Sequence, residues 1–381
     1  MTELSSAERH RYSRHLILPE VGLSGQKKLK SSSVLCVGAG GLGSPLALYL
    51  AAAGIGKIGI IDFDLVDETN LQRQILHGTS TIGQSKLESA KARLKDLNPH
   101  VEVECISERL EANNAIELFK KYDIVADGTD NFPTRYLVND ACVLTGTPNV
   151  YGSIFQFEGQ ISVFHYENGP CYRCVYAEPP PPGLVPSCAE GGVLGVLPGI
   201  VGCLQANEVI KIICEMGEVA SGRLIMIDAL GLKFRELKIR KDPNCAICSN
   251  KPTITEPIDY ELFCGIPQAT EAEAPVPSIS VKELDKIIKQ QKDETRVIDV
   301  REPVEVDICQ IPSTEKVPLN TLSQAAKDWD KKTTYYIHCK LGGRSAKAVR
   351  ELQSMGFKNV FNVDGGISAW IQKVDPSLTD Y

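Results

Sequence analysis

Short apolar runs and longer helix-like stretches alternate along the first part of the chain. The runs predict strands at residues 34–37, 58–61, 123–126 and 161–164, and the stretch 44–53 predicts a helix. Strands and helices that alternate in this way are typical of a parallel sheet with helices on both faces. The sequence therefore predicts an α/β fold with a Rossmann-like, doubly wound sheet.

The pattern changes after residue 251. The segment PQATEAEAPVPS is rich in Pro, Ala and Glu and shows no periodicity, which is typical of a linker. A second α/β pattern starts near Ile279. We therefore expect a first domain over residues 1–251, a linker over 252–278 and a smaller α/β domain over 279–381.

Composition narrows the class of protein. The chain has 381 residues, enough for two or three domains, and 43% of them are apolar, which is enough for buried cores. The net charge of -7 disfavours a general nucleic-acid-binding protein, which usually presents a basic face.

We expect no segment of the sequence to enter a membrane. The first residues, MTELSSAERHRYSRH, are polar and charged, unlike a secretory signal. The longest apolar run, 191–204, is interrupted by Pro198 and is too short to cross a bilayer. We therefore expect a cytoplasmic protein that contacts neither a membrane nor, directly, nucleic acid.

Cysteine usage points to metal and thiol chemistry. The chain has 13 cysteines, and two C-x-x-C pairs stand out: Cys171 with Cys174, and Cys245 with Cys248. An odd count with such pairs favours metal binding over a disulfide framework. The two pairs fit a closed tetrahedral Zn²⁺ site that joins distant parts of one domain. A redox-active dithiol is the alternative.

A G-x-G-x-x-G motif, formed by Gly38, Gly40 and Gly43, lies between a predicted strand and a predicted helix. Glycines here, Gly41 among them, let the backbone approach phosphates, and the helix N-terminus favours an anion. Asp62 ends the next predicted strand, where an acidic residue can hold a ribose hydroxyl. The motif predicts a nucleotide site, although a tight turn that packs a helix onto a sheet would use the same glycines.

Further polar residues follow the motif and favour a triphosphate over a dinucleotide. They are Asn70, Arg73, Gln74, Lys86, Asp130 and Asn131. Two cations with a carboxylate suit a triphosphate and Mg²⁺. No G-x-x-x-x-G-K-[ST] motif is present, so the site is not a P-loop. Each of these residues alone is also consistent with a solvated surface.

Four segments carry a resemblance to a known family. RYSRHLILPEVG, GAGGLGSP, DFDLVDETNLQRQ and DGTDNFPTRYLVND resemble the bacterial adenylyltransferases that activate molybdopterin synthase and thiamine sulfur carriers, relatives of the ubiquitin-activating enzymes. The resemblance covers residues 5–248, in order and without large gaps.

This resemblance implies an ATP site and its partners. The implied ATP-site residues are Gly41, Asp62, Asn70, Arg73, Lys86 and Asp130. In the family Asp130 holds Mg²⁺, and Arg14 reaches the phosphates of the other subunit, which implies a homodimer. The four paired cysteines bind structural zinc in the family. A carboxylate that attacks the α-phosphate builds charge that Arg73, Lys86 and Mg²⁺ could stabilise, so we expect Arg73 and Asp130 to be catalytic.

Cys188 lies in PSCAEGG, between a proline run and a glycine-rich segment. A loop of this composition is typically exposed, but an inert cysteine is the usual alternative. The resemblance implies more, because relatives with a sulfurtransferase tail have a cysteine here. That cysteine attacks the activated carrier or helps to release it from a disulfide, so Cys188 is a candidate catalytic residue.

Cys339 ends a predicted strand, 335–338, and precedes a glycine loop, Arg344 and a predicted helix, 346–355. Backbone N–H groups, the helix dipole and Arg344 would stabilise a thiolate there, so both residues are candidate catalytic residues. Sulfur transfer and phosphate-ester hydrolysis both use such a cradle. The four residues between Cys339 and Arg344 are one fewer than in cell-cycle phosphatases, which favours sulfur transfer.

The same region resembles a rhodanese domain. VIDVREPVEVDICQI, HCKLGGRSAKAV and GFKNVFNVDGGISAW carry the match, over residues 279–375. It implies that Cys339 carries a persulfide and that Asp299 and Arg301 form a structural pair near the loop. Lys340 departs from the arginine that many members have after the cysteine, and keeps the charge.

Together the halves resemble the molybdopterin-synthase adenylyltransferase/sulfurtransferases of bacteria and eukaryotes. The resemblance implies adenylation of a ubiquitin-like sulfur carrier ending in Gly-Gly, then sulfur transfer from a persulfide supplied by a donor such as a cysteine desulfurase. Expected cofactors are ATP, Mg²⁺ and Zn²⁺. A nucleotide-dependent oxidoreductase with an accessory rhodanese domain is the main alternative, and a non-catalytic scaffold is the second. Molybdenum cofactor synthesis, thiamine synthesis, tRNA thiolation and cysteine synthesis all remain possible pathways.

Overall fold

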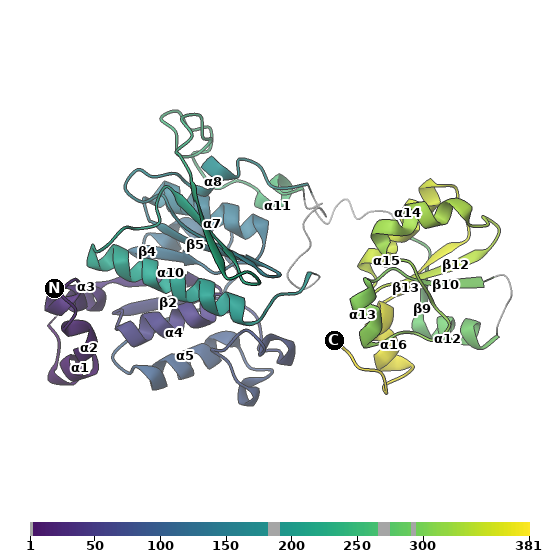
Figure 1. Cartoon of the computed structure of the whole chain (residues 1–381), viewed down its shortest axis with the longest axis horizontal. Helices are drawn as coiled ribbons and strands as arrows, with labels where there is room; N and C mark the ends of the chain where they lie inside the picture. The colour runs from purple at the N-terminus through teal and green to yellow at the C-terminus, as the bar shows by residue number, and fades with distance from the viewer. Residues whose placement is uncertain (1–2, 182–190, 266–274, 291–294) are drawn as a thin grey trace. The chain divides into compact units, whose positions relative to one another are not determined.

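An eight-stranded sheet organises the first of the two units into which the chain divides, Met1–Gln268 and Ala269–Tyr381. The computed structural model describes residues 3–181, 191–265, 275–290 and 295–381 (Figure 1). In sheet order, the strands of the first unit are β3 (Glu102–Ile106), β2 (Lys57–Ile61), β1 (Ser33–Val37), β4 (Ile124–Asp127), β5 (Asn149–Phe155), β6 (Glu158–Phe164), β7 (Arg223–Asp228) and β8 (Lys233–Lys238).

This sheet is parallel from β3 to β5 and antiparallel from β5 to β8. Only Gln156 and Phe157 separate β5 from β6, and so short a connection can join only antiparallel strands. The predicted α/β class is confirmed. The strand expected at 161–164 is present in β6, but the expectation of a wholly parallel sheet is wrong for this half.

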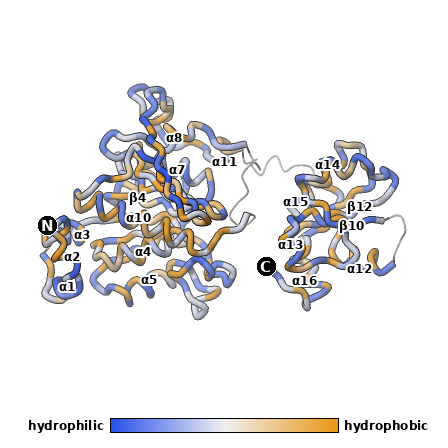
Figure 2. Tube along the Cα trace, viewed as in Figure 1, coloured by the Kyte–Doolittle hydropathy of each residue, from blue (hydrophilic) through white to orange (hydrophobic). Residues whose placement is uncertain are grey.

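Helices cover both faces of the sheet. One face carries α3 (Gly22–Ser31), α4 (Gly43–Ala53), α5 (Lys86–Leu97) and α10 (Val196–Cys214), and the other carries α6 (Ala115–Phe119), α7 (Phe132–Thr145), α8 (Tyr172–Val175) and α11 (Tyr260–Phe263). Successive strand residues point to opposite faces, so Cys36 packs with the first layer and Leu35 with the second. In Figure 2 the orange of apolar residues follows α4, α10 and the inner strands. Two short helices, α1 (Ser6–Arg11) and α2 (Ser13–Leu16), precede the sheet.

By length and composition α10 could cross a membrane, and among the described residues it is the one helix that passes this test. Half of that segment is buried inside the unit. Gln205 on α10 donates to the carbonyls of Asp127 and Val150 on the sheet, which is the behaviour of a core helix. Pro198 lies in the first turn of α10, where its missing N–H leaves no helical hydrogen bond unmade.

A buried ion pair joins α7, α8 and α11. The Arg173 guanidinium donates to both carboxylate oxygens of Asp140, at 2.7 and 2.8 Å, and the Tyr260 hydroxyl donates to the same carboxylate at 3.0 Å. Removing one partner of such a pair costs about 3–5 kcal/mol, because the other charge stays buried. Tyr260 lies in the segment expected to be linker, yet it packs into the core of the first unit.

The second unit is built on a five-stranded parallel sheet. Its strands, in sheet order, are β11 (Glu315–Lys316), β10 (Thr295–Asp299), β12 (Thr334–His338), β13 (Val360–Asp364) and β9 (Ser278–Ser280). α14 (Leu322–Ala325) and α15 (Gly343–Ser354) pack on one face, and α12 (Val281–Gln290) and α16 (Gly366–Lys373) on the other. The short helix α13 (Pro303–Ile308) follows β10.

His338, at the end of β12, is the only histidine of the second unit and is fully buried. Burial lowers its pKa to about 4, although Asp299 beside it, 3.7 Å from Nε2, acts in the opposite direction. The neutral imidazole is therefore the form that fits the folded unit.

We expect the second unit to lose stability as the pH falls from 7 to 5. Below the ordinary histidine pKa of about 6.5, the unfolded chain takes up a proton that folded His338 refuses, at about 1.4 kcal/mol per pH unit, so the loss is about 2 kcal/mol at pH 5. Both tryptophans, Trp329 and Trp370, lie in this unit, so denaturation of the full chain followed by tryptophan fluorescence reports on it alone.

His338→Gln should remove most of this pH dependence. The prediction is contradicted if wild type and variant lose the same stability between pH 7 and pH 5.

Candidate active site

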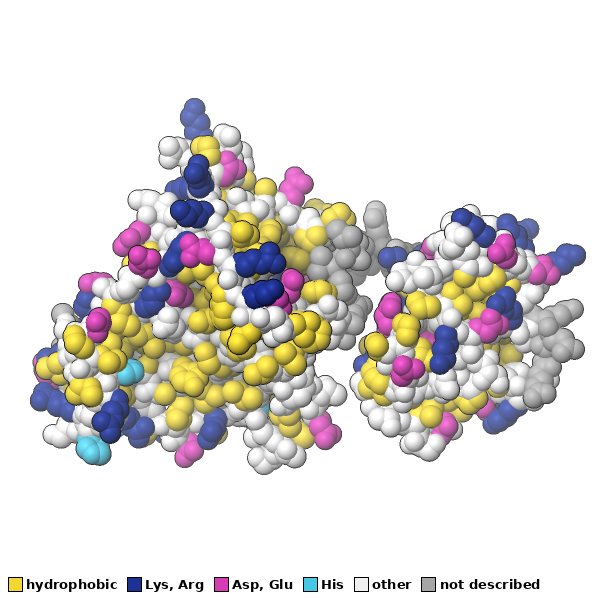
Figure 3. Space-filling view, in the orientation of Figure 1, with side chains coloured by type: hydrophobic (Ala, Val, Ile, Leu, Met, Phe, Trp, Pro, Cys, Tyr) yellow, Lys and Arg dark blue, Asp and Glu magenta, His cyan; other side chains and the backbone are white. Residues whose placement is uncertain are grey.

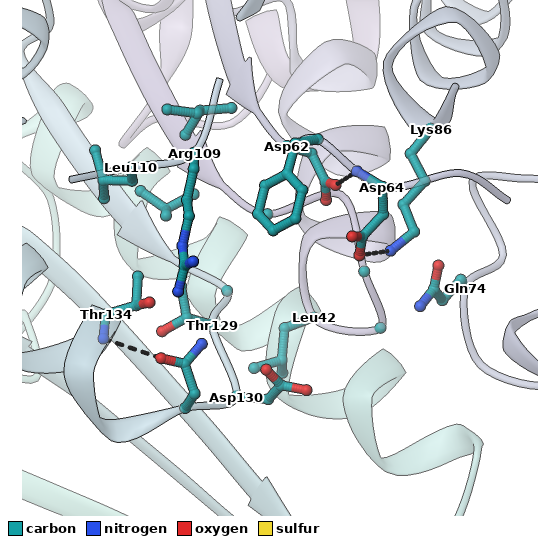
Figure 4. A pocket seen from close by; sticks show the side chains of 18 of the residues that line it. Leu42, Asp62, Asp64, Gln74, Lys86, Arg109, Leu110, Thr129, Asp130 and Thr134 are labelled. Atoms are coloured by element: carbon teal, nitrogen blue, oxygen red, sulfur yellow. Dashed lines mark hydrogen bonds and ion pairs between the residues drawn. The ribbon is translucent and has the colours of Figure 1, made fainter. Parts of the chain in front are cut away.

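An open cavity of about 280 Å³ lies at the carboxyl ends of β1, β2 and β4 (Figure 4). The carboxyl ends of parallel strands meet at one edge of a sheet, and doubly wound folds bind ligands at this edge. Most of the predicted nucleotide-binding residues line the cavity: Gly38, Gly40, Gly41, Asp62, Arg73, Gln74, Lys86, Asp130 and Asn131.

The glycine turn beneath the cavity depends on close backbone contact. Gly38 has a φ of +93°, and a Cβ on Gly43 would lie 2.0 Å from the Gly38 carbonyl oxygen. Helix α4 can therefore begin directly after the turn, with its unpaired N–H groups near the cavity, which favours an anion there. Gly43 shapes the site without lining it.

Asp62 follows β2 and lines the cavity. One of its carboxylate oxygens accepts a hydrogen bond from the Ala39 N–H and the other from the Asp64 N–H, both at 2.8 Å. These bonds fix the carboxylate against the glycine turn. Each oxygen keeps a second lone pair, so the group can still accept from a ribose hydroxyl.

Lys86 and Asp64 form an ion pair of 2.7 Å at the cavity wall, and Figure 4 shows them pointing toward each other. Lys86 is buried, whereas about half of the Asp64 side chain is exposed. An anionic ligand in the cavity would compete with Asp64 for the ammonium group. Asp64 was not among the predicted residues, although it lies two positions after Asp62.

The segment after the short 3₁₀ helix η1 (Glu68–Asn70) supplies Arg73 and Gln74. Arg73 donates to the Thr69 carbonyl at 3.2 Å, and Gln74 donates to the Asn70 side chain at 2.5 Å. Asn70 thus orients Gln74 and does not line the cavity itself. The Gln74 Oε1 atom is buried without a partner, which makes it an acceptor that a bound ligand can satisfy.

Asp130 and Asn131 follow β4 and line the cavity. Figure 4 shows Asp130 on the opposite side of the cavity from Lys86. Asp130 is exposed and makes no hydrogen bond or ion pair with any other residue that the structure describes, so its oxygens are available to a cation. Asn131 accepts from the Thr134 N–H at 3.0 Å and caps α7.

Arg14 is exposed on α2 and does not line this cavity. Cys188 lies outside the described residues.

Several residues at the cavity were not predicted. Arg109 follows β3, a strand that the sequence pattern did not single out, and it pairs with Glu261 of α11 at 3.1 Å. His77 does not line the cavity but contacts its glycine turn. The ring lies within 3.0 Å of both the Ala39 carbonyl and the Ser89 hydroxyl, and burial lowers its pKa. Such positions become visible only when distant segments are brought together.

The four paired cysteines meet at one point of the first unit. The Sγ atoms of Cys171, Cys174, Cys245 and Cys248 all lie within 4.8 Å of one another, and none is in a disulfide. The separations are 3.5 Å between Cys171 and Cys245 and 3.3 Å between Cys174 and Cys248. Zn–S bonds of about 2.3 Å in a tetrahedron place sulfur atoms roughly 3.8 Å apart, so this donor set fits Zn²⁺.

In the second unit, Cys339 lies between β12 and α15 and is buried. Its Sγ accepts a hydrogen bond from the Gly342 N–H at 3.1 Å and from the Ser345 hydroxyl at 3.3 Å. Gly342 has a φ of +103°, which turns its N–H inward. These donors form a cradle for a sulfur anion.

Arg344, expected to stabilise this anion, donates instead to both carboxylate oxygens of Glu305, at 2.6 and 2.7 Å. Burial is the largest single influence and raises the pKa of Glu305, but the hydrogen bonds from Arg344, the Glu302 N–H and Tyr381, together with the charge of Arg344, hold the pKa below its ordinary value. Asp299 and Arg301 form the expected buried pair. Ser345, Glu305 and Tyr381 were not predicted as parts of this site.

Comparison with known proteins identifies relatives of both units. Residues 12–247 match the ThiF family, and residues 280–373 match the rhodanese-like domain. The probable adenylyltransferase/sulfurtransferase MoeZ of Mycobacterium tuberculosis is 47% identical over 99% of this chain and 96% of its own. Adenylyltransferase and sulfurtransferase MOCS3 of Drosophila yakuba is 46% identical over 100% of this chain and 86% of its own. The crystal structure of E. coli MccB, 25% identical, has a TM-score of 0.58 over 64% of this chain and 73% of that one.

We expect the purified protein to contain about one zinc ion per chain, held by the cysteine cluster. Cys245→Ser removes one ligand and should lower both the zinc content, measured by mass spectrometry of the metal, and the melting temperature. Cys203→Ser, on α10 and outside the cluster, is the matched control and should keep its zinc. Equal zinc in both variants would contradict the assignment.

Proposed function

Because the chain belongs to the ThiF family and carries a rhodanese-like domain after it, we propose that it is an adenylyltransferase and sulfurtransferase. It activates the C-terminal carboxylate of a small ubiquitin-like carrier with ATP and then delivers sulfur to that carboxylate. The observation that carries this proposal is that relatives matched along almost the whole chain are named for both activities. The alternative of an oxidoreductase is not favoured, because these names contain no redox activity.

The first step is attack of the carrier's carboxylate on the α-phosphorus of ATP. A C-terminal carboxylate has a pKa of about 3.5, so it is ionised at pH 7 and needs no base. The new C–O–P linkage forms as the bond to pyrophosphate breaks, which gives an acyl-adenylate. Arg73 and Lys86, both at the cavity wall, stabilise the charge that develops on the phosphates. Asp130, with its free carboxylate, would hold Mg²⁺, which neutralises phosphate charge when bound.

The second step uses sulfur carried by Cys339. The thiolate attacks the outer sulfur of a persulfide donor, such as a cysteine desulfurase, and the donor leaves as its own thiolate. The cradle of Gly342 and Ser345 would then hold the Cys339 persulfide anion. This anion attacks the activated carbonyl carbon, AMP leaves, and an acyl disulfide joins carrier and enzyme.

A second thiol must release the product. We propose that the Cys188 thiolate attacks the Cys339 sulfur, so that the carrier leaves as a thiocarboxylate and a Cys188–Cys339 disulfide forms. An external dithiol then reduces this disulfide and restores both cysteines. Cys188 therefore acts once in each turnover.

We further propose a homodimer in which Arg14 serves the neighbouring subunit's cavity. Two observations support it. Arg14 is exposed and apart from its own cavity. Exposed apolar side chains also gather on the face of the first unit that α4 and α10 cover (Figure 3), with Tyr49 and Val196 among those more than half exposed. Apolar patches of this kind mark interfaces.

We also propose that bound zinc has a structural role and that the protein is cytoplasmic. Zinc would tie Cys171 and Cys174, which flank the buried Arg173, to the segment that carries Cys245 and Cys248. The carrier's pathway stays open among molybdenum cofactor, thiamine, tRNA thiolation and cysteine synthesis.

Asp130→Ala should reduce ATP–pyrophosphate exchange with a Gly-Gly-ending carrier by at least 100-fold, because the site loses its candidate metal ligand. Asp96→Ala, on an exposed part of α5, is the matched control and should exchange at the wild-type rate. Unchanged exchange in Asp130→Ala would sink the assignment of this cavity to adenylation.

Cys339→Ser should leave this exchange intact and abolish thiocarboxylate formation, because the two steps use different units. Mass spectrometry of candidate carriers, incubated with ATP and a persulfide donor, detects the product as one sulfur in place of one oxygen. The carrier that changes also identifies the pathway. Thiocarboxylate formed by Cys339→Ser at the wild-type rate would disprove the role of Cys339.

A further inference from the structure

The segment that follows α16 returns to the sulfurtransferase loop and places Tyr381 against it. The Tyr381 hydroxyl accepts a hydrogen bond from Arg301 Nη1 at 2.8 Å and donates to Glu305 Oε1 at 3.1 Å. The hydroxyl therefore both accepts and donates a hydrogen bond. Of its two partners, Arg301 precedes α13 and Glu305 lies within it. Burial raises the pKa of Tyr381 to about 12, so the hydroxyl keeps its proton at any working pH.

The ring of Tyr381 makes a separate contact. The Lys340 ammonium lies 4.2 Å from the ring centroid, within the range of a cation–π interaction. Lys340 makes no hydrogen bond or ion pair with any other side chain in the described part of the chain. The ring is therefore the contact that holds this cation beside Cys339.

The two cations of the loop, Arg344 and Lys340, differ in whether a carboxylate neutralises them. The guanidinium of Arg344 is neutralised by two bonds to Glu305. Lys340 has no carboxylate partner, so it is the cation of the loop that remains to attract an anionic sulfur donor. The carbonyls of Cys339 and Lys340 are themselves fixed, because they accept from the N–H groups of Ile367 and Ser368 in the first turn of α16. With the backbone held, the position of the Lys340 side chain depends on Tyr381.

We propose that Tyr381 is a positioning residue of the sulfurtransferase site, whose ring seats Lys340 for anionic sulfur donors and whose hydroxyl braces the Glu305–Arg344 pair. The proposal rests on the sulfurtransferase function proposed above. The two contacts separate chemically, because phenylalanine keeps the ring and removes only the hydroxyl, whereas leucine removes both.

The test uses the full-length chain with thiosulfate as donor and cyanide as acceptor. The Cys339 thiolate takes the outer sulfur of thiosulfate and releases sulfite, and cyanide then takes that sulfur as thiocyanate and restores the thiolate. Tyr381→Leu should raise the KM for thiosulfate about fivefold, because the Lys340 ammonium loses the cation–π contact that positions it. Tyr381→Phe should keep the KM and lower kcat about threefold, because the hydrogen bonds of the hydroxyl to Arg301 and Glu305 are both lost. Tyr336→Phe, in the same unit and with its ring against Phe361, is the matched control and should change neither constant.

A double-mutant cycle tests the link to Lys340. Lys340→Met alone should raise the KM, and Tyr381→Leu should add little in that background, because contacting residues are not additive. Fully additive effects would overturn the proposal, as would KM and kcat within twofold of wild type in both Tyr381 variants. Tryptophan fluorescence melting of each variant shows whether the second unit is folded. If Tyr381→Leu does not fold, the other two variants still test the proposal. The proposal is rejected if Tyr381→Phe leaves kcat unchanged and Lys340→Met leaves the KM for thiosulfate unchanged.

Cys339→Ser distinguishes a failure of the proposed sulfurtransferase function from a failure of the proposed role of Tyr381. If that variant still transfers sulfur, the proposed function of the loop fails. If it is inactive while the Tyr381 variants behave as wild type, only the role of Tyr381 fails.

Discussion

Close backbone contact at the start of a helix, possible only because that helix begins with glycine, is the constraint on which the site in each unit depends. In the first unit a Cβ on Gly43 would lie 2.0 Å from the carbonyl of Gly38. In the second, a Cβ on Gly366 would lie 2.3 Å from the carbonyl of Cys339. Each glycine lets a helix abut the carboxyl edge of a parallel sheet. In the first unit the unpaired N–H groups of α4 then face this edge, where an anion can bind. In the second unit the N–H groups of Ile367 and Ser368 on α16 donate to the carbonyls of Cys339 and Lys340 and so fix the loop.

In the first unit, Asp62, Asp64 and Lys86 already have partners within the protein at the edge of the cavity. Lys86 is paired with Asp64, and Asp62 is bonded to the backbone of the glycine turn. Among the described residues that line the cavity, only Gln74 presents a buried side-chain oxygen without a partner. An adenylyltransferase needs a cavity of this kind, because groups already in place stabilise developing charge with little reorganisation. The second edge follows the same logic, with the sulfur of Cys339 held by Gly342 and Ser345.

The two units differ in the contacts that hold in place the elements that carry each site. In the first, the Asp140–Arg173 pair and the Tyr260 hydroxyl tie α7, α8 and α11 together, and the cysteine cluster joins the α8 segment to residues 245–248. In the second, support comes from the segment after α16, through Tyr381. Neither support touches the reacting atoms. Both act by limiting how far the elements that carry those atoms can move.

The spacing of residues within short segments was sufficient to predict the strand–turn–helix units and the candidate residues that they carry. The glycine motif, Asp62 after β2, the cysteine pairs and the Cys339 loop all depend on neighbours within a few residues, so sequence pattern predicted them. The resemblance to known families supplied Arg14, the family role of Asp130 in holding Mg²⁺ and the role of Cys188, which periodicity alone does not give.

Only the tertiary structure decided which side chains meet across long stretches of chain. The antiparallel half of the sheet, the Lys86–Asp64 pair and the packing of Tyr260 on α7 were not predicted. Arg344 bonds to Glu305, and Tyr381 reaches Lys340, through contacts between residues far apart in sequence. The reason is physical: turns and caps are set by backbone geometry over a few residues, whereas distant pairs depend on how helices rotate and pack against the sheet.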